Sequence, residues 1–273
     1  MDLGLKDKVA LVVASSTGLG LATALELARE GTKVVICGRS QARLDTAVDR
    51  LKAELGAEMA SSAAQSANIV AFTCDVLDPA QIEKLVANTV KTFGGIDILI
   101  TNAGGPPGGT FDNTAINAWE TAFNLTLLSV TRFVQAALPH LRKSNAASIL
   151  TITSVSVKQP VAGLLLSNVY RPAVVGLTKT LSQELASENI RVNSILPGWT
   201  ATDRVTQIFE YRAVHNKSTV EVERAKVTTA IPLGRMGDPS EFGRVAAFLV
   251  SPAASYITGA MLQVDGGSYS GLL

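Results

Sequence analysis

The sequence has few of the residues that cross-link chains or bind metal ions. Its 273 residues include two cysteines and two histidines. Cys37 and Cys74 each lie at the end of an apolar run, where an unpaired thiol usually serves as a small buried hydrophobic side chain. We therefore expect no disulfide. His140 and His215 lie far apart among residues that are poor metal ligands, so we expect no metal site.

An excess of either charge and a long hydrophobic run are also lacking. The 24 basic and 23 acidic side chains give a formal net charge of +1, which favours neither nucleic acid nor an anionic membrane as a partner. No apolar run approaches the roughly 18 residues of a membrane span, and residues 1–8 are polar and charged. We expect a soluble, cytoplasmic protein that binds small molecules.

Short apolar runs alternate with helical patterns along the whole chain. Runs rich in valine, isoleucine and leucine predict seven strands, at residues 9–13, 34–37, 69–74, 98–101, 148–153, 192–196 and 261–264. Continuous apolar runs are typical of parallel strands that are covered on both faces. The pattern predicts an α/β fold: a Rossmann-type, doubly wound parallel sheet of seven strands in three α/β/α layers. The length and the 47% hydrophobic content fit a single domain, residues 1–273.

The turn after the first run is the most informative segment. A strand, a glycine-containing turn and a helix in succession direct free backbone N–H groups and the positive end of a helix dipole toward one point. This arrangement suits the pyrophosphate of a dinucleotide. A Gly-x-Gly pattern also marks ordinary turns, but the helix and strand that follow favour the phosphate site. The residues expected to bind the cofactor here are Ala14, Ser16, Thr17, Gly18, Leu19 and Gly20.

Characteristic residues follow the other strands in a fixed order. Asp75 and Val76 come after the third run, Asn102, Ala103 and Gly104 after the fourth, Ser154 after the fifth, Pro197 and Gly198 after the sixth, and Asp265, Gly266 and Gly267 after the last. Together with the first turn and Asn124, this set resembles the short-chain dehydrogenase/reductase family over nearly the whole chain. Within that family it is most similar to the 3-oxoacyl-[acyl-carrier-protein] reductase branch.

The resemblance implies an NAD(P)-dependent oxidoreductase that reduces a carbonyl group to a secondary alcohol or catalyses the reverse reaction. It implies that Asp75 and Val76 hold the adenine end of the cofactor and that Asn102, Ala103 and Gly104 line the adenosine half. It places the nicotinamide beside Pro197, Gly198, Thr200 and Thr202. Family members pair their fourth and fifth helices across a two-fold axis, which implies a homotetramer or a homodimer.

The end of the second run bears on the choice of cofactor. An acidic residue there would accept hydrogen bonds from the ribose of NAD, whereas an arginine pairs with the 2′-phosphate of NADP. Gly38 takes the usual acidic position and Arg39 follows it, which favours NADP(H) over NAD(H). The alternative is that Arg39 is a solvated cation at the start of the next helix.

Three positions depart from the family pattern. Ala14 replaces the first glycine, which we expect to be tolerated on condition that its backbone keeps a negative φ. The positions of the family's catalytic tyrosine and lysine, counted from Ser154, hold Ser167 and Arg171. A serine hydroxyl is a far weaker acid than a phenol, and arginine stays protonated, so neither residue fits the usual role.

Several candidates remain for the chemistry. Ser154 is suited to hydrogen-bond a carbonyl oxygen as negative charge builds on it, and Asn124 to hold a water or bend its helix; both residues also fit a local structural role. Arg171 shares a helix face with Ser167 and brings positive charge and donors for ribose hydroxyls. Lys158 is a further donor candidate, with solvent exposure as the alternative.

Tyr170 is the phenol nearest to the vacant position. The adjacent Pro172 disfavours a regular helix, so a kink or a late helix start would turn Tyr170 toward the nicotinamide. The alternative is ordinary aromatic packing elsewhere. Two other functions also stay open: a catalytically impaired dinucleotide-binding homologue that acts as a sensor or assembly partner, and a dehydratase or isomerase, for which no base is evident.

Residues 200–232 interrupt the strand–helix rhythm and predict a substrate lid, with a plain surface excursion as the alternative. Their cations Arg204, Arg212 and Lys217 would meet an anionic carrier or remain solvated. Residues 56–68, rich in alanine and serine, predict a loop or an extension of the second helix. The substrate's expected neighbours are mostly apolar, which favours a 3-oxoacyl thioester or an apolar ketone. These neighbours are Gly105, Pro106, Pro107, Val155, Val157, Pro160, Leu164 and Trp199.

Overall fold

The computed structural model describes residues 1–58 and 68–272 and contains one parallel seven-stranded sheet with the order β3-β2-β1-β4-β5-β6-β7. The strands are β1 (Val9–Val12), β2 (Lys33–Gly38), β3 (Ile69–Thr73), β4 (Ile98–Thr101), β5 (Ser148–Ile152), β6 (Arg191–Pro197) and β7 (Met261–Val264). All seven predicted strands are confirmed, and no boundary differs by more than one residue. Continuous apolar runs were sufficient to locate them because both faces of the sheet are covered.

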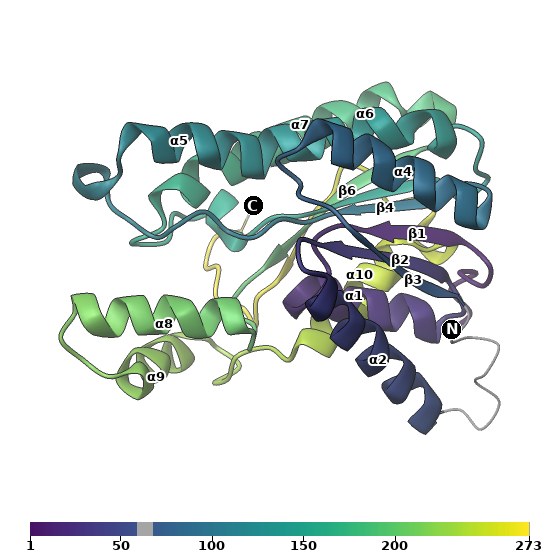
Figure 1. Ribbon diagram of the computed structural model, residues 1–273. Helices are drawn as coiled ribbons and strands as arrows, with labels where there is room; N and C mark the ends of the chain where they lie inside the picture. Colours follow the sequence, from purple (N-terminus) through teal and green to yellow (C-terminus); the bar gives the residue numbers. More distant parts are fainter. Residues whose placement is uncertain (59–67, 273) are drawn as a thin grey trace.

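Helices cover both faces of the sheet, as Figure 1 shows. One layer contains α1 (Gly18–Arg29), α2 (Gln41–Glu58) and α10 (Pro239–Val250), and the other contains α4 (Pro79–Phe93), α6 (Ser129–Leu141) and α7 (Leu165–Glu184). Alternate strand residues serve the two layers: Val12 and Ile36 pack into the first, and Leu11 and Val35 into the second. The predicted three-layer α/β/α architecture is therefore confirmed.

The close packing of α10 on α1 depends on a glycine. A Cβ at Gly243 would lie 2.7 Å from the carbonyl oxygen of Ala22 and 2.9 Å from Cγ of Glu26. Backbone atoms on one side leave no room for a methyl group. Gly243 thus lets the two helices approach until the neighbouring Phe242 is fully buried in the first layer.

The fourth helical pattern folds as two helices joined by a wider turn. Between α5 (Ile116–Phe123) and α6, residues Asn124–Leu128 form a π-helical turn. The amide of Asn124 donates a hydrogen bond to the carbonyl oxygen of Glu120 at 2.8 Å. Single π-turns inside α-helices frequently lie at functional sites, and this one begins at the asparagine that the sequence pattern singled out.

Residues 200–232 contain α8 (Asp203–His215) and α9 (Val220–Ala230), which lie beside the three layers at the lower left of Figure 1. They have a small core of their own, in which Phe209 and Val227 are buried. The rings of Trp199 and Phe209 stack with centroids 5.6 Å apart. The segment therefore leaves the strand–helix alternation and packs around a small core apart from the two main ones. Its role as a lid stays a prediction.

Four further predictions from the sequence concern the cysteines, a membrane span, a metal site and residues 56–68. Both cysteines are free and buried. No helix within the described ranges has the length and hydropathy that crossing a bilayer requires, and the same residues contain no group of three or more potential ligands for a metal ion. Of the segment 56–68, residues 59–67 lie outside the described residues, and α2 continues to Glu58.

Replacement of Gly243 by alanine should reduce the free energy of unfolding by about 1–3 kcal/mol, because the methyl group overpacks the contact between α1 and α10. Gly176→Ala in α7 is the matched control, since a Cβ there meets nothing within 4 Å; it should stabilise the helix by up to about 1 kcal/mol. Urea unfolding followed by circular dichroism measures both changes. Equal effects of the two substitutions would contradict the packing argument.

Candidate functional site

The carboxyl ends of the parallel strands form one edge of the sheet, and the strand order reverses direction between β1 and β4. In open parallel sheets, ligands bind beyond the strand ends at such a switch point. The turn after β1 and the Asn102–Ala103–Gly104 turn after β4 flank it. The Asn102 side chain joins them by donating a hydrogen bond from Nδ2 to the carbonyl oxygen of Ala14 at 3.0 Å. The two predicted cofactor turns are thus held together.

The turn after β1 presents the start of α1 to this edge. Gly18, the first residue of the helix, has a φ of 61°. A Cβ at Gly20 would lie 2.8 Å from Cα of Ser15 and 2.9 Å from the carbonyl oxygen of Ala14, so the turn requires glycine there. The N-cap residue Thr17 makes no side-chain capping bond. The first N–H groups of α1 therefore need another acceptor, and an anionic ligand supplies one.

Ala14 contradicts the expectation of a negative φ. Its φ is 49°, in the left-handed region that costs an L-residue about 1–2 kcal/mol. The strain is maintained by contacts on both sides of the residue: the N–H points to Sγ of Cys37 at 3.4 Å, and the carbonyl accepts the bond from Asn102. The chain thus keeps a glycine-like turn with alanine, because its neighbours fix the backbone.

The ends of β2 and β3 lie side by side, since the N–H of Cys74 donates to the carbonyl oxygen of Gly38 at 2.9 Å. A Cβ at Gly38 would lie 3.1 Å from Oγ of Ser16, which leaves little space for an acidic side chain. Arg39 is exposed, and the ion pairs of the described residues leave it without a carboxylate partner. Asp75 accepts a hydrogen bond from the N–H of Leu77 at 3.0 Å, and Val76 is buried.

The end of β6 leads the chain back to the first turn. Gly198 follows Pro197, and its N–H donates to the carbonyl oxygen of Val264 at 2.9 Å. A Cβ at Gly198 would lie 2.7 Å from Cα of Asp265, so the close approach of these two backbone segments also needs glycine. Thr200 is buried. Thr202, the N-cap of α8, has its Cγ2 3.8 Å from the position of a Cβ on Gly18.

Ser154 lies directly after β5 and caps a short 3₁₀-helix, Val155–Val157. Its Oγ accepts a hydrogen bond from the N–H of Ser156 at 3.1 Å, so its own proton is available for donation. Arg171 reaches the same place from α7. Its Nη1 donates to the carbonyl oxygens of Thr153 at 2.8 Å and Ile152 at 3.4 Å. Arg171 is therefore anchored to the two residues that directly precede Ser154 at the end of β5.

The environment of Arg171 reduces the stability of its charged form. Burial, and to a lesser extent repulsion by Arg204, lower the pKa of Arg171 to about 10. The side chain remains a cation at neutral pH, in a site where water screens its charge poorly. The sequence pattern assigned Arg204 to the lid and gave no sign that it lies close to Arg171; only the fold brings these two residues together.

Tyr170 packs against α5. Its ring lies 6.2 Å from that of Trp119 at an interplanar angle of 70°, and 6.1 Å from that of Phe123. The hypothesis of a late helix start is wrong, because α7 begins at Leu165 and continues through Pro172. The contacts are those of the alternative interpretation, in which Tyr170 is an ordinary packed aromatic. Ser167 is buried on α7, one turn before Arg171.

Lys158 lies against the C-terminal segment, with Nζ 5.3 Å from the ring centroid of Tyr269.

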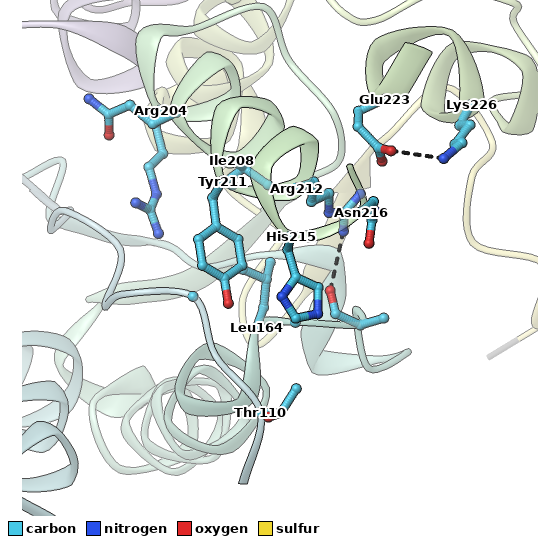
Figure 2. A pocket seen from close by; sticks show the side chains of 14 residues that line it. Thr110, Leu164, Arg204, Ile208, Tyr211, Arg212, His215, Asn216, Glu223 and Lys226 are labelled. Atoms are coloured by element: carbon cyan, nitrogen blue, oxygen red, sulfur yellow. Dashed lines mark hydrogen bonds and ion pairs between the residues drawn. The ribbon is translucent and has the colours of Figure 1, made fainter. Parts of the chain in front are cut away.

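A cavity of about 590 Å³ lies between α8 and the loops at 108–110 and 162–164. Figure 2 shows side chains of α8 that extend across it toward Leu164 and Thr110. Within α8, the rings of Tyr211 and His215 stack with centroids 6.1 Å apart. The segment 200–232 thus forms one wall of the cavity.

Residues 13–269 match the family model described as enoyl-(acyl carrier protein) reductase. The 3-oxoacyl-[acyl-carrier-protein] reductase FabG of Thermotoga maritima is 30% identical over 263 residues, which cover 96% of this chain and 98% of the relative. L-sorbose reductase from Gluconobacter frateurii, solved with NADPH and L-sorbose, superposes on this chain with a TM-score of 0.90 at 29% identity. The superposition covers all of both chains.

A short-chain oxidoreductase of Pseudomonas aeruginosa PAO1, solved with NADPH and described as containing an atypical catalytic center, is 32% identical, with a TM-score of 0.85. The alignment covers 97% of this chain and 98% of that one. The order of the strand-end residues, the seven-stranded sheet and these similarities agree. The chain belongs to the short-chain dehydrogenase/reductase family of oxidoreductases, in its FabG-like branch.

Proposed function

We propose that the protein is an NADP(H)-dependent reductase that converts the carbonyl group of an apolar ketone or a 3-oxoacyl thioester to a secondary alcohol, or catalyses the reverse oxidation. The observation that carries the proposal is that Arg171 bonds the carbonyl oxygen of Thr153, the residue directly before Ser154, at the end of β5. This pair lies on the edge of the sheet that also presents the phosphate turn.

The residues on this edge fit NADP(H). The uncapped start of α1 and the close approach at Gly20 provide N–H groups and space for the pyrophosphate. Gly38 has no carboxylate to repel a 2′-phosphate, and the exposed Arg39 next to it is free of carboxylate partners among the described residues. Asn102, Asp75, Pro197 and Thr202 lie around the same edge. The NADPH complexes of two similar proteins support this assignment.

When bound, the reduced nicotinamide supplies a hydride to the carbonyl carbon. Ser154 donates a hydrogen bond to the carbonyl oxygen, and the guanidinium of Arg171 stabilises the negative charge that builds on it. The Ser154 hydroxyl then delivers a proton to the alkoxide and regains one from water. In this mechanism, a fixed positive charge replaces the early proton donation that a phenol provides in the family.

The wall formed by residues 200–232 supports their assignment as a substrate lid. Oligomerisation through the α5–α7 layer is supported by apolar side chains that are exposed in the single chain. They are Ile116, Phe123 and Val169. Two copies related by a two-fold axis would bury them, as expected for a homodimer or a homotetramer.

Ser154→Ala should lower kcat/KM for carbonyl reduction about 100-fold, since one hydrogen-bond donor to the developing oxyanion is lost. Its affinity for NADPH should not change. Tyr170→Phe is the matched control. The substitution also removes one hydroxyl, and it leaves the packing of the ring against α5 intact. Steady-state kinetics with a panel of ketones and 3-oxoacyl thioesters tests both variants. Loss of activity in Tyr170→Phe alone would overturn the assignment of Ser154, and tight NADPH binding without any turnover would favour a non-catalytic protein.

Arg39→Ala should weaken NADPH binding about 10- to 100-fold, since a charge-assisted contact to the 2′-phosphate contributes about 1.5–3 kcal/mol. The affinity for NADH should stay the same, because NADH lacks that phosphate. Arg43→Ala, which removes an exposed arginine in the first turn of α2, controls for the general loss of positive charge. Fluorescence titration of the wild type and both variants with NADPH and NADH gives the six affinities. An equal effect of the two variants on NADPH would show that Arg39 is a solvated cation.

A further inference from the structure

We infer that the substrate carries a carboxylate, which binds to Arg204 in the cavity beside α8, while Arg212 adds positive charge further along the same helix. The inference rests on the proposed carbonyl reduction and adds to it the chemical class of the substrate, an oxo acid with an apolar body. The cavity of about 590 Å³ has the size of small-molecule sites, roughly 300–1,000 Å³.

Arg204 connects this cavity to the site of chemistry. Its Nη2 donates to the carbonyl oxygen of Pro106 at 2.7 Å, and its guanidinium lies against Gly105, where a Cβ would be 3.0 Å from Nη2. Its charge also contributes to the lowered pKa of Arg171. A group bound to Arg204 therefore lies near the oxygen that Arg171 and Ser154 stabilise.

Arg212 lies two helical turns further along α8. Its Cζ is 4.9 Å from the ring centroid of Trp199, and its Nη2 donates to the carbonyl oxygen of Ala162 at 3.2 Å. Burial lowers the pKa of both Arg204 and Arg212, and nearby Glu223 partly offsets this effect for Arg212. Each guanidinium has five N–H donors, so one bond to a backbone carbonyl leaves most of them available.

The charges around the cavity are not balanced. Glu223 is its one acidic lining residue among those described, and this carboxylate accepts bonds from Lys226 at 2.8 Å and Ser218 at 2.6 Å. These contacts lower the pKa of Glu223 to about 2, so the ion pair with Lys226 persists at neutral pH. Figure 2 shows this pair apart from Arg204. Arg204 and Arg212 form no ion pair within the described residues.

The partly desolvated guanidinium of Arg204, which has no carboxylate partner among the described residues, favours an anionic ligand, since a charge-assisted bond recovers the solvation that burial removes. The remaining walls are apolar or aromatic, with Leu164, Ile208 and Tyr211 among them. A carboxylate suits a guanidinium because both are planar and pair through two parallel hydrogen bonds. The cavity therefore selects a carbonyl compound with an apolar body and a carboxylate.

The test compares the wild-type enzyme on 3-oxohexanoate, methyl 3-oxohexanoate and 3-oxohexanoyl-coenzyme A, with NADPH as the reductant. We expect kcat/KM for the acid to exceed that for the ester at least tenfold. Arg204→Gln should reduce this preference at least fivefold, mainly through KM, and Arg212→Gln should reduce it less, because Arg212 lies two helical turns further along α8. Arg224→Gln, an exposed arginine of α9 outside the cavity, should keep the preference.

A second measurement does not depend on turnover. Hexanoate should raise the melting temperature of the wild-type NADPH complex more than hexanol does, and Arg204→Gln should abolish the difference. Circular dichroism of each variant verifies its fold. Equal kcat/KM for acid and ester would overturn the inference and leave the reductase intact. An arginine-dependent preference for the coenzyme A thioester over the free acid would also overturn it, since a phosphate would then be the anion. If the enzyme binds NADPH but reduces none of the three compounds, the result would count against the proposed function itself.

Discussion

The hydrogen bond from Nη1 of Arg171 to the carbonyl oxygen of Thr153 is the contact on which the proposed chemistry depends. It joins α7 to the end of β5 and anchors a cation to the residue directly before Ser154, whose hydroxyl proton is available for donation. In the family pattern, the positions of Ser167 and Arg171 hold a tyrosine and a lysine. With serine and arginine at those positions, we assign stabilisation of the developing oxyanion to charge, and charge is effective here because burial limits its screening.

Close backbone contacts position the cofactor side of the site. Gly20, Gly38 and Gly198 lie where a Cβ would meet neighbouring atoms at 3.1 Å or less. Backbone contacts also fix Ala14. The turn keeps a left-handed conformation that alanine disfavours, because bonds to β2 and to Asn102 hold it. The geometry of the turn is a property of the surrounding sheet more than of the residue at its first position.

The sequence was sufficient to predict the sheet and the edge that carries the site. Continuous apolar runs identify strands that are buried on both faces, and the residues that follow parallel strands must gather at one edge. Side-chain directions within helices were harder to predict. The pattern around Pro172 left two orientations open for Tyr170, and the choice depended on Trp119 and Phe123 of a distant helix. The proximity of Arg204 to Arg171, and the wall that α8 contributes to the cavity, likewise follow from tertiary packing that local spacing does not encode.

The most direct test of the account is the rate of hydride transfer in a single turnover, measured by stopped-flow absorbance of NADPH in Arg171→Lys and Arg171→Gln. If a fixed positive charge at this position stabilises the oxyanion, the lysine variant should retain transfer within about tenfold of the wild type. The glutamine variant, saturated with NADPH, should be slower by about 100-fold or more. Transfer at the wild-type rate in Arg171→Gln would contradict the account, because the reaction would then proceed without the charge that we place at its centre.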